Sequence, residues 1–168
     1  QELARIDVNV KQQSSTAAVK KFIAMHAPPR HDAEQIWADA LAEAERTNRR
    51  VWARVSGRHC GPCFQLSRWL DDHRELLEQD FVLIKIDGSN DLNAAQISLF
   101  ITGGKEGGIP FHAIFAPAGE RLIDSEGPAG NIGNPSGDEG KRHLRRMLTE
   151  TRQRLTDAEI DQLIDSLE

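Results

Sequence analysis

Residues 51–63 read VWARVSGRHCGPC and end in a pair of cysteines separated by two residues. Val51 to Ser56 reads as a strand, and Gly57 to His59 turn the chain toward Cys60. Pro62 is best placed in the first turn of a helix, where its missing N–H costs nothing. This passage therefore predicts a strand, a short connection and a helix that begins at the two cysteines.

The segments on either side of this passage continue the alternation of helices and strands. Asp32 followed by Gln35 resembles a capping box, which is a common helix start. Apolar residues then recur at helical spacing: Ile36, Trp37, Ala40, Leu41 and Ala44. The helix that begins at the cysteines is expected to run through about residues 64–79, and the apolar run Phe81–Ile86 predicts a strand buried on both faces of a parallel sheet.

The second half of the chain contains a hairpin signal and two helices. Asn90 is expected to cap a short helix that runs to about Phe100, and glycines mark the loop that follows it. Two short apolar runs, residues 111–116 and 121–124, flank a Pro/Gly turn and predict an antiparallel hairpin. A glycine-rich loop is expected over 125–140. Helices are then predicted over 139–151 and from the capping box Thr156–Glu159 onward.

Residues 1–30 carry weaker secondary-structure signals than the rest of the chain. Ile6, Val8 and Val10 alternate with polar residues and suggest a short strand, while Val19–Met25 fits either a strand or a helix. Because the first residue is Gln1 and not Met, we expect an exported, periplasmic protein after removal of a signal peptide. An excised domain of a cytoplasmic protein is the alternative.

Composition narrows the classes of function. The chain has 168 residues, an ordinary length for one domain, and its 21 basic and 26 acidic residues give a net charge of −5. This balance argues against nucleic acid or an anionic membrane as the main partner. No apolar stretch is long enough for a membrane helix. Two cysteines are too few for a small secreted fold held together by disulfides.

These segments resemble the thioredoxin fold. The resemblance rests on residues 51–63, 81–87 and 108–110, and it covers about residues 33–150. Cys60-Gly61-Pro62-Cys63 matches the thioredoxin active-site tetrapeptide in full, and Ile109–Pro110 stands where the family places its cis-proline. The extensions make the chain similar to bacterial thioredoxin-like proteins. The resemblance implies an α/β fold with a mixed central sheet flanked by helices.

The domain organisation follows from this resemblance. Residues 1–31 are expected to form an N-terminal extension, residues 32–151 the thioredoxin-like domain, and residues 152–168 a C-terminal capping helix.

The resemblance also implies a thiol–disulfide oxidoreductase that forms a redox disulfide. Cys60 is the expected nucleophile and Cys63 the resolving thiol. The positive end of a helix favours the Cys60 thiolate. His59, Gly61 and Pro62 form the active-site loop. His59 stands where thioredoxins usually carry Trp, and it either stabilises the thiolate as an imidazolium or is an exposed loop histidine.

Substrate binding is assigned to the segment around the predicted cis-proline. A cis bond at Pro110 would leave the backbone of Ile109 free to pair with a substrate strand beside Cys60. Phe111 is the candidate for a hydrophobic contact with the bound peptide. The expected partners are a disulfide-containing protein substrate and an upstream reductase as electron donor, with no cofactor and no metal.

Two residues depart from the thioredoxin pattern. Arg54 occupies the position of a buried Asp that serves the resolving cysteine, and arginine is not a base. If Arg54 lies beneath the site, its charge would favour the Cys63 thiolate. If it faces the sheet end or solvent, it would have no effect on Cys63. Arg68 replaces a proline of the active-site helix, which predicts a straighter helix.

Other interpretations of the cysteine pair remain. Half a zinc site is disfavoured because a structural site needs four ligands and no second CXXC exists. The pair would otherwise be a structural disulfide in a non-catalytic module that binds peptides or proteins. A peroxide-reducing enzyme fits less well, because it relies on a single peroxidatic thiol.

Overall fold

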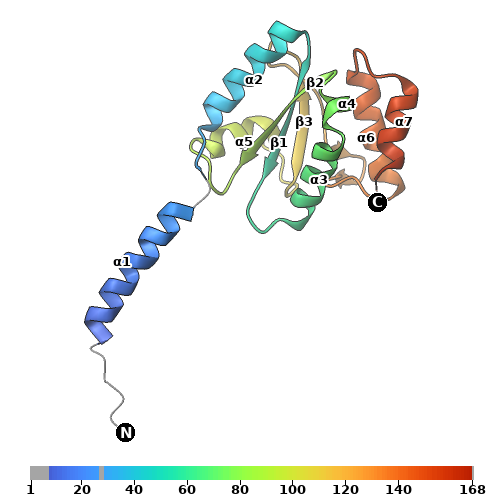
Figure 1. Ribbon diagram of the computed structural model, residues 1–168. Helices are drawn as coiled ribbons and strands as arrows, with labels where there is room; N and C mark the ends of the chain where they lie inside the picture. Colours follow the sequence, from blue (N-terminus) through green and yellow to red (C-terminus); the bar gives the residue numbers. More distant parts are fainter. Residues whose placement is uncertain (1–7, 27–28, 168) are drawn as a thin grey trace. The chain divides into compact units, whose positions relative to one another are not determined.

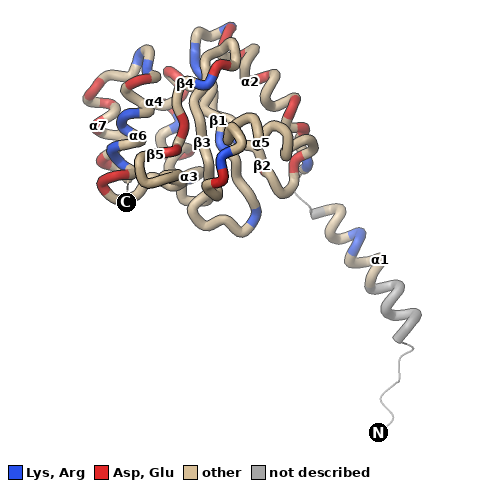
Figure 2. Tube along the Cα trace, turned by 180° about the vertical axis from the view of Figure 1, so that it is seen from behind, with Lys and Arg blue, Asp and Glu red and all other residues tan. Residues whose placement is uncertain are grey.

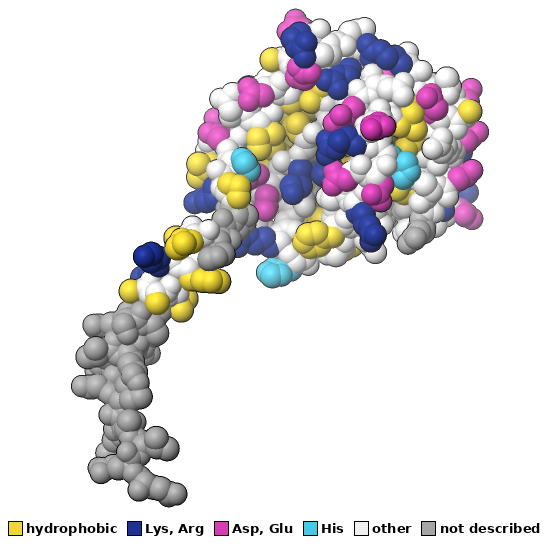
Figure 3. Space-filling view, in the orientation of Figure 1, with side chains coloured by type: hydrophobic (Ala, Val, Ile, Leu, Met, Phe, Trp, Pro, Cys, Tyr) yellow, Lys and Arg dark blue, Asp and Glu magenta, His cyan; other side chains and the backbone are white. Residues whose placement is uncertain are grey.

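The computed structural model describes residues 8–26 and 29–167. The chain separates into two compact units, residues 1–30 and 31–168. In the first unit, α1 (Val8–His26) is a helix, so the predicted strand is wrong at Val8 and Val10, and Ile6 lies outside the described residues. A few alternating residues are too short a signal to outweigh a run without Gly or Pro. α1 exposes Val19, Phe22, Ile23 and Met25 (Figure 3).

The second unit is built on a four-stranded mixed sheet in the order β2-β1-β3-β4. β1 (Arg50–Ser56) is parallel to β2 (Phe81–Asp87) and antiparallel to β3 (Phe111–Phe115). β3 pairs with β4 (Arg121–Asp124) in the predicted hairpin. β2 is an edge strand in which Val82, Leu83 and Ile84 are only half-buried, so the expected burial on both faces is wrong.

Helices cover both faces of this sheet (Figure 1). α2 (Ala33–Thr47) and α5 (Ala94–Thr102) pack on one face over a core that includes Val51, Ala53 and Phe115. α3 (Gly61–Asp72), α4 (Arg74–Leu77), α6 (Gly137–Thr151) and α7 (Asp157–Asp165) pack with the other face, around Trp52, Leu66 and Leu144. Acidic residues lie along the exposed sides of α2 and α7 (Figure 2). This architecture confirms the predicted fold class.

Three helix boundaries differ from the sequence predictions. The helix expected over 64–79 ends at Asp72, where His73 leaves the helical conformation (φ −112°, ψ 17°) and its ring donates to the Trp69 carbonyl at 2.8 Å; α4 begins at the next residue. The N-cap residue of α5 is Asn93 and not Asn90, and its side chain makes no capping hydrogen bond; Leu92, just before it, pairs with Asp32 in an isolated bridge. α6 begins at Gly137, two residues early, and the preceding loop contains a small hairpin of β5 (Glu126–Gly127) and β6 (Gly130–Asn131).

Candidate functional site

The two cysteines lie at the N-terminus of α3 and form a disulfide. The two sulfur atoms are 2.01 Å apart and the Cα atoms 5.2 Å apart. Cys60 is the N-cap residue, and its Sγ accepts the backbone N–H of Cys63 at 3.2 Å. Cys60 is half-buried, whereas Cys63 is only 3% exposed. An incoming reagent therefore reaches Cys60 first, at the end of the helix where backbone N–H groups favour a negative charge.

The loop before Cys60 is tied to the loop between β2 and α5. The Arg58 guanidinium donates to Asn90 Oδ1 at 2.8 Å. His59 adopts a left-handed backbone conformation, with φ of 60°, and its side chain is exposed. Gly61 and Pro62 are exposed beside it, with Pro62 in the first turn of α3 as predicted. These residues form the rim around the Cys60 sulfur.

The Ile109–Pro110 segment lies against the same sulfur. Its peptide bond is cis, as the resemblance predicted, and the Ile109 carbonyl oxygen is 3.6 Å from Cys60 Sγ. The Ile109 side chain is 43% exposed, while Pro110 is buried. A Cβ added to Gly57 would lie 2.9 Å from Ile109 Cδ1, so the two loops meet closely at this point.

Phe111 does not lie where the predicted contact with a bound peptide needs it. Its side chain is fully buried in the core beneath α5, and its ring is not open to a bound peptide. Ile109 and Phe64, the latter 67% exposed on α3, are instead exposed apolar side chains next to the cysteine pair. Pro110 places the next residue at the start of β3, where strand alternation turns the Phe111 side chain inward.

Arg54 is buried in β1, 8% exposed, on the sheet face that carries Trp52 and α3. Its Nε has no hydrogen-bond partner among the described residues. Burial lowers the pKa of Arg54 to about 10, while Asp71 raises it and Arg74 lowers it, so the guanidinium is charged at pH 7. The expectation of a solvent-facing arginine is therefore excluded. The charged groups that act on Arg54 belong to the distal end of α3 and to α4.

His112 is a buried polar residue beside this arginine that sequence reasoning did not assign to the site. It pairs with Arg54 across β1 and β3 and is fully buried. The indole N–H of Trp52 donates to its Nδ1 at 3.2 Å, and its Nε2 donates to the Gly133 carbonyl at 3.1 Å. Burial is the main reason that the pKa of His112 is lowered to about 4. The hydrogen bond to Gly133 raises this pKa, and the charge of Arg54 lowers it. His112 is therefore neutral and links β3 to the loop after β6.

Two buried histidines, His112 and His143, form hydrogen bonds with backbone carbonyls and not with the cysteines. His143 contacts the Asp124 carbonyl through Nε2 at 2.8 Å, and His112 is occupied as described above. Within residues 8–26 and 29–167, no three or more His, Cys, Asp or Glu side chains cluster in a way that would hold a metal ion. Nor is any helix in the described part of the chain long and apolar enough to cross a membrane.

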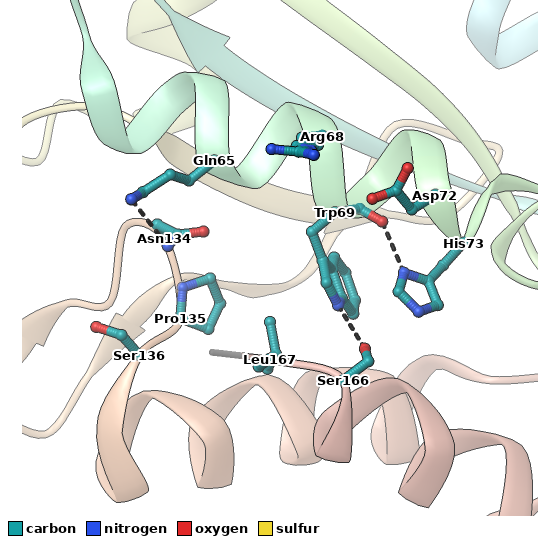
Figure 4. Close-up of a pocket in the computed structure, with 10 residues that line it drawn as sticks. All are labelled: Gln65, Arg68, Trp69, Asp72, His73, Asn134, Pro135, Ser136, Ser166 and Leu167. Atoms are coloured by element: carbon teal, nitrogen blue, oxygen red, sulfur yellow. Dashed lines mark hydrogen bonds between the residues drawn. The ribbon is translucent and has the colours of Figure 1, made fainter.

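A cavity of about 670 Å³ lies between the outer side of α3 and the C-terminal helices (Figure 4). Gln65, Arg68 and Trp69 line it from α3, and Asn134 and Ser166 from the opposite side. The Trp69 indole donates to Ser166 Oγ at 2.9 Å, and the Asn134 amide donates to Gln65 Oε1 at 3.3 Å. Arg68 is exposed here, and α3 runs without interruption from Gly61 to Asp72.

Comparison with known structures shows the same fold. A disulphide isomerase from Xylella fastidiosa Temecula1 is 18% identical over 83% of this chain and 94% of its own, with a TM-score of 0.53. The germline-specific thioredoxin Deadhead from Drosophila melanogaster is 15% identical over 74% of this chain and 100% of its own, with a TM-score of 0.50. A comparison with curated proteins returned no match.

A family model described as thioredoxin-like matches residues 32–117. This range contains β1, the cysteine pair, β2, α5 and the cis-proline. A thioredoxin fold with a CXXC pair at disulfide distance supports thiol–disulfide oxidoreductase chemistry in general. The chain belongs to the thioredoxin-like family.

Proposed function

We propose that this protein reduces disulfides in protein substrates by dithiol–disulfide exchange, with Cys60 as nucleophile and Cys63 as resolving thiol. The observation that carries the proposal is the position of the Cys60 sulfur. It lies at the N-terminus of α3, bonded to the buried Cys63 and 3.6 Å from the Ile109 carbonyl. This arrangement joins an accessible sulfur, a shielded partner and a backbone edge for substrate.

The exchange proceeds in two displacements. In the dithiol form, the Cys60 thiolate attacks one sulfur of the substrate disulfide, whose S–S bond breaks, and the departing thiolate takes up a proton. Cys63 loses its proton and attacks the Cys60 sulfur, which releases the second substrate thiol and forms the Cys60–Cys63 disulfide. Two electrons have then passed to the substrate. An upstream reductase returns two electrons and restores the dithiol.

Substrate is held by backbone pairing beside Ile109. Pro110 has no N–H, so the polar groups that pair with an extended peptide are those of Ile109. The exposed Ile109 and Phe64 side chains offer apolar contact to a peptide bound near Cys60. His59, Gly61 and Pro62 complete the rim that the peptide meets. The substrate class is therefore an unfolded or loop segment that carries a disulfide.

The proton of Cys63 is not taken by an acid–base residue at position 54. Arg54 is charged and buried on the α3 face, so water or another group accepts that proton. We expect exchange to persist with this arrangement. A Cys63 that remains protonated and leaves mixed disulfides unresolved would contradict this expectation.

The test is insulin reduction with dithiothreitol, comparing the wild type with Cys60→Ser and Cys63→Ser. Cys60→Ser is expected to abolish catalysis. Cys63→Ser is expected to stop turnover but to accumulate a mixed disulfide through Cys60, visible by mass spectrometry. Equal behaviour of the two variants would contradict the division of roles.

Redox titration of the cysteine pair tests the direction of the reaction. A reductase is expected to have a midpoint potential below about −240 mV, near that of thioredoxin. A midpoint above about −180 mV would contradict the reductase role and indicate an oxidase or isomerase. A pair that does not cycle would refute the enzyme and favour a non-catalytic binding module, in which Cys60→Ser leaves peptide affinity unchanged.

A further inference from the structure

The Asn131 side chain binds the loop that carries the cis-proline. Its Nδ2 donates to the carbonyls of Pro110 at 3.0 Å, Gly107 at 3.1 Å and Gly108 at 3.3 Å. The amide has two hydrogens for three acceptors, so one hydrogen is shared. The carbonyl omitted from this set is that of Ile109, which instead lies 3.6 Å from Cys60 Sγ.

The orientation of this amide is set by two donors on its other side. Asn131 Oδ1 accepts the Ser125 hydroxyl at 2.7 Å and the Gly133 N–H at 3.1 Å. Rotation of the amide by 180° would place its oxygen against three carbonyls and its NH₂ against two donors. Ser125 is itself fully buried, and its Oγ accepts the N–H of His112 in β3 at 3.0 Å. Asn131 is thus anchored to the sheet.

The loop that Asn131 holds lies outside regular secondary structure. Residues 103–110 connect α5 to β3 and belong to no helix or strand. Backbone carbonyls in such a segment need partners outside regular structure. The two segments also pack closely, since a Cβ added to Gly107 would lie 3.0 Å from Asn131 Cβ. A single side chain with two donors and one acceptor satisfies this geometry, and neither Asp nor Ala supplies it.

We propose that Asn131 is a positioning residue for the redox site. By holding the carbonyls on both sides of Ile109, it keeps the Ile109 backbone beside the Cys60 sulfur, where the substrate peptide pairs. Asn131 contacts neither the cysteines nor the substrate, and it acts through the loop. The inference rests on the proposed function, because the Ile109 backbone is the substrate edge in that proposal.

The test compares Asn131→Asp and Asn131→Ala with Asn134→Asp as a matched control. Asn134 lies three residues further on, between β6 and α6, and its amide donates to Gln65 on α3 (Figure 4). For insulin, kcat/KM is expected to fall at least about tenfold in both Asn131 variants, because a misplaced edge no longer orients the peptide. A small aromatic disulfide has no peptide strand to pair, and its reduction rate is expected to stay near wild type. The control is expected to match wild type on both substrates.

The outcomes separate positioning from general damage. An equal loss on both substrates, or no loss on insulin, would overturn the proposal. Asn131→Ala adds no charge and decides the question if Asn131→Asp does not fold. Amide hydrogen exchange of residues 107–109, measured by mass spectrometry, is expected to accelerate in Asn131→Ala and not in Asn134→Asp. If the wild type reduced neither substrate, the proposed function would fail, while the exchange data would still show whether Asn131 holds the loop.

Discussion

His112 shows how one buried side chain connects the sheet to the loop beside the site. Trp52 donates to one ring nitrogen and Gly133 accepts from the other, which defines a single neutral tautomer. Protonation would place a hydrogen on Nδ1 against the Trp52 N–H and a second positive charge beside Arg54. His143 and Asp124 are the other charged or titratable groups that act on this ring, in opposite directions. The fold therefore excludes the imidazolium.

This exclusion predicts a loss of stability in mild acid. The pKa of His112 is about 4 in the fold against 6.5 for an ordinary histidine, so between these pH values only the unfolded chain binds the proton. The free energy of unfolding is expected to fall by about 2 kcal/mol from pH 7 to pH 5 through this group. Urea titrations of the wild type and His112→Gln would measure it. The free energy of unfolding of His112→Gln is expected to depend less on pH than that of the wild type. The same pH dependence in both proteins would contradict the prediction.

At the scale of elements, one carboxylate holds the connection between α6 and α7. Asp80, between α4 and β2, is fully buried. Its two oxygens accept the backbone N–H groups of Gln153 at 2.9 Å, Arg154 at 2.8 Å and Leu155 at 3.0 Å. These bonds replace the ones that the chain loses where α6 ends. The connection to the C-terminal helix α7 is thereby joined to the start of β2, at the end of the sheet opposite to the cysteines.

Removing this carboxylate is expected to loosen the C-terminal helix. Asp80→Ala would leave three buried or half-buried N–H groups without a partner, and we expect a loss of about 3 kcal/mol in the free energy of unfolding. Asp72→Ala is the matched control, because Asp72 is exposed and its side chain forms no hydrogen bond within the described residues. Chemical denaturation of both variants measures the difference. Equal stability of the two would show that Asp80 does not hold the connection.

At the scale of the whole molecule, the second unit contains the sheet, both core clusters and the candidate site. We expect a chain of residues 31–168 to fold and to reduce insulin at the rate of the full chain, because these contacts are complete within it. The unfolding midpoint and the insulin rate of both chains are the measurements. A marked loss of either would show that residues 1–30 contribute to the folded domain or to the site.

The sequence by itself determined the features that depend on neighbouring residues. Caps at Asp32 and Thr156 place helix starts, and the structure contains both, the second as a full capping box. The hairpin follows from apolar runs around a Pro/Gly turn. The spacing of Cys60 and Cys63 places both sulfurs on the first turn of α3. Each of these signals acts over a few residues, and together with the resemblance to the thioredoxin fold they predicted the fold class.

The tertiary structure alone decided the features that depend on distant residues. Asn131 reaches a carbonyl 21 residues away, and Asp80 binds amides 73 to 75 residues away, so no local pattern marks either residue. Phe111 is buried in β3, which lies between two other strands. Several side chains of β2 are only half-buried, because β2 lies at the edge of the sheet. Burial and hydrogen-bond partners of this kind arise only when the sheet is assembled, since packing between elements sets them.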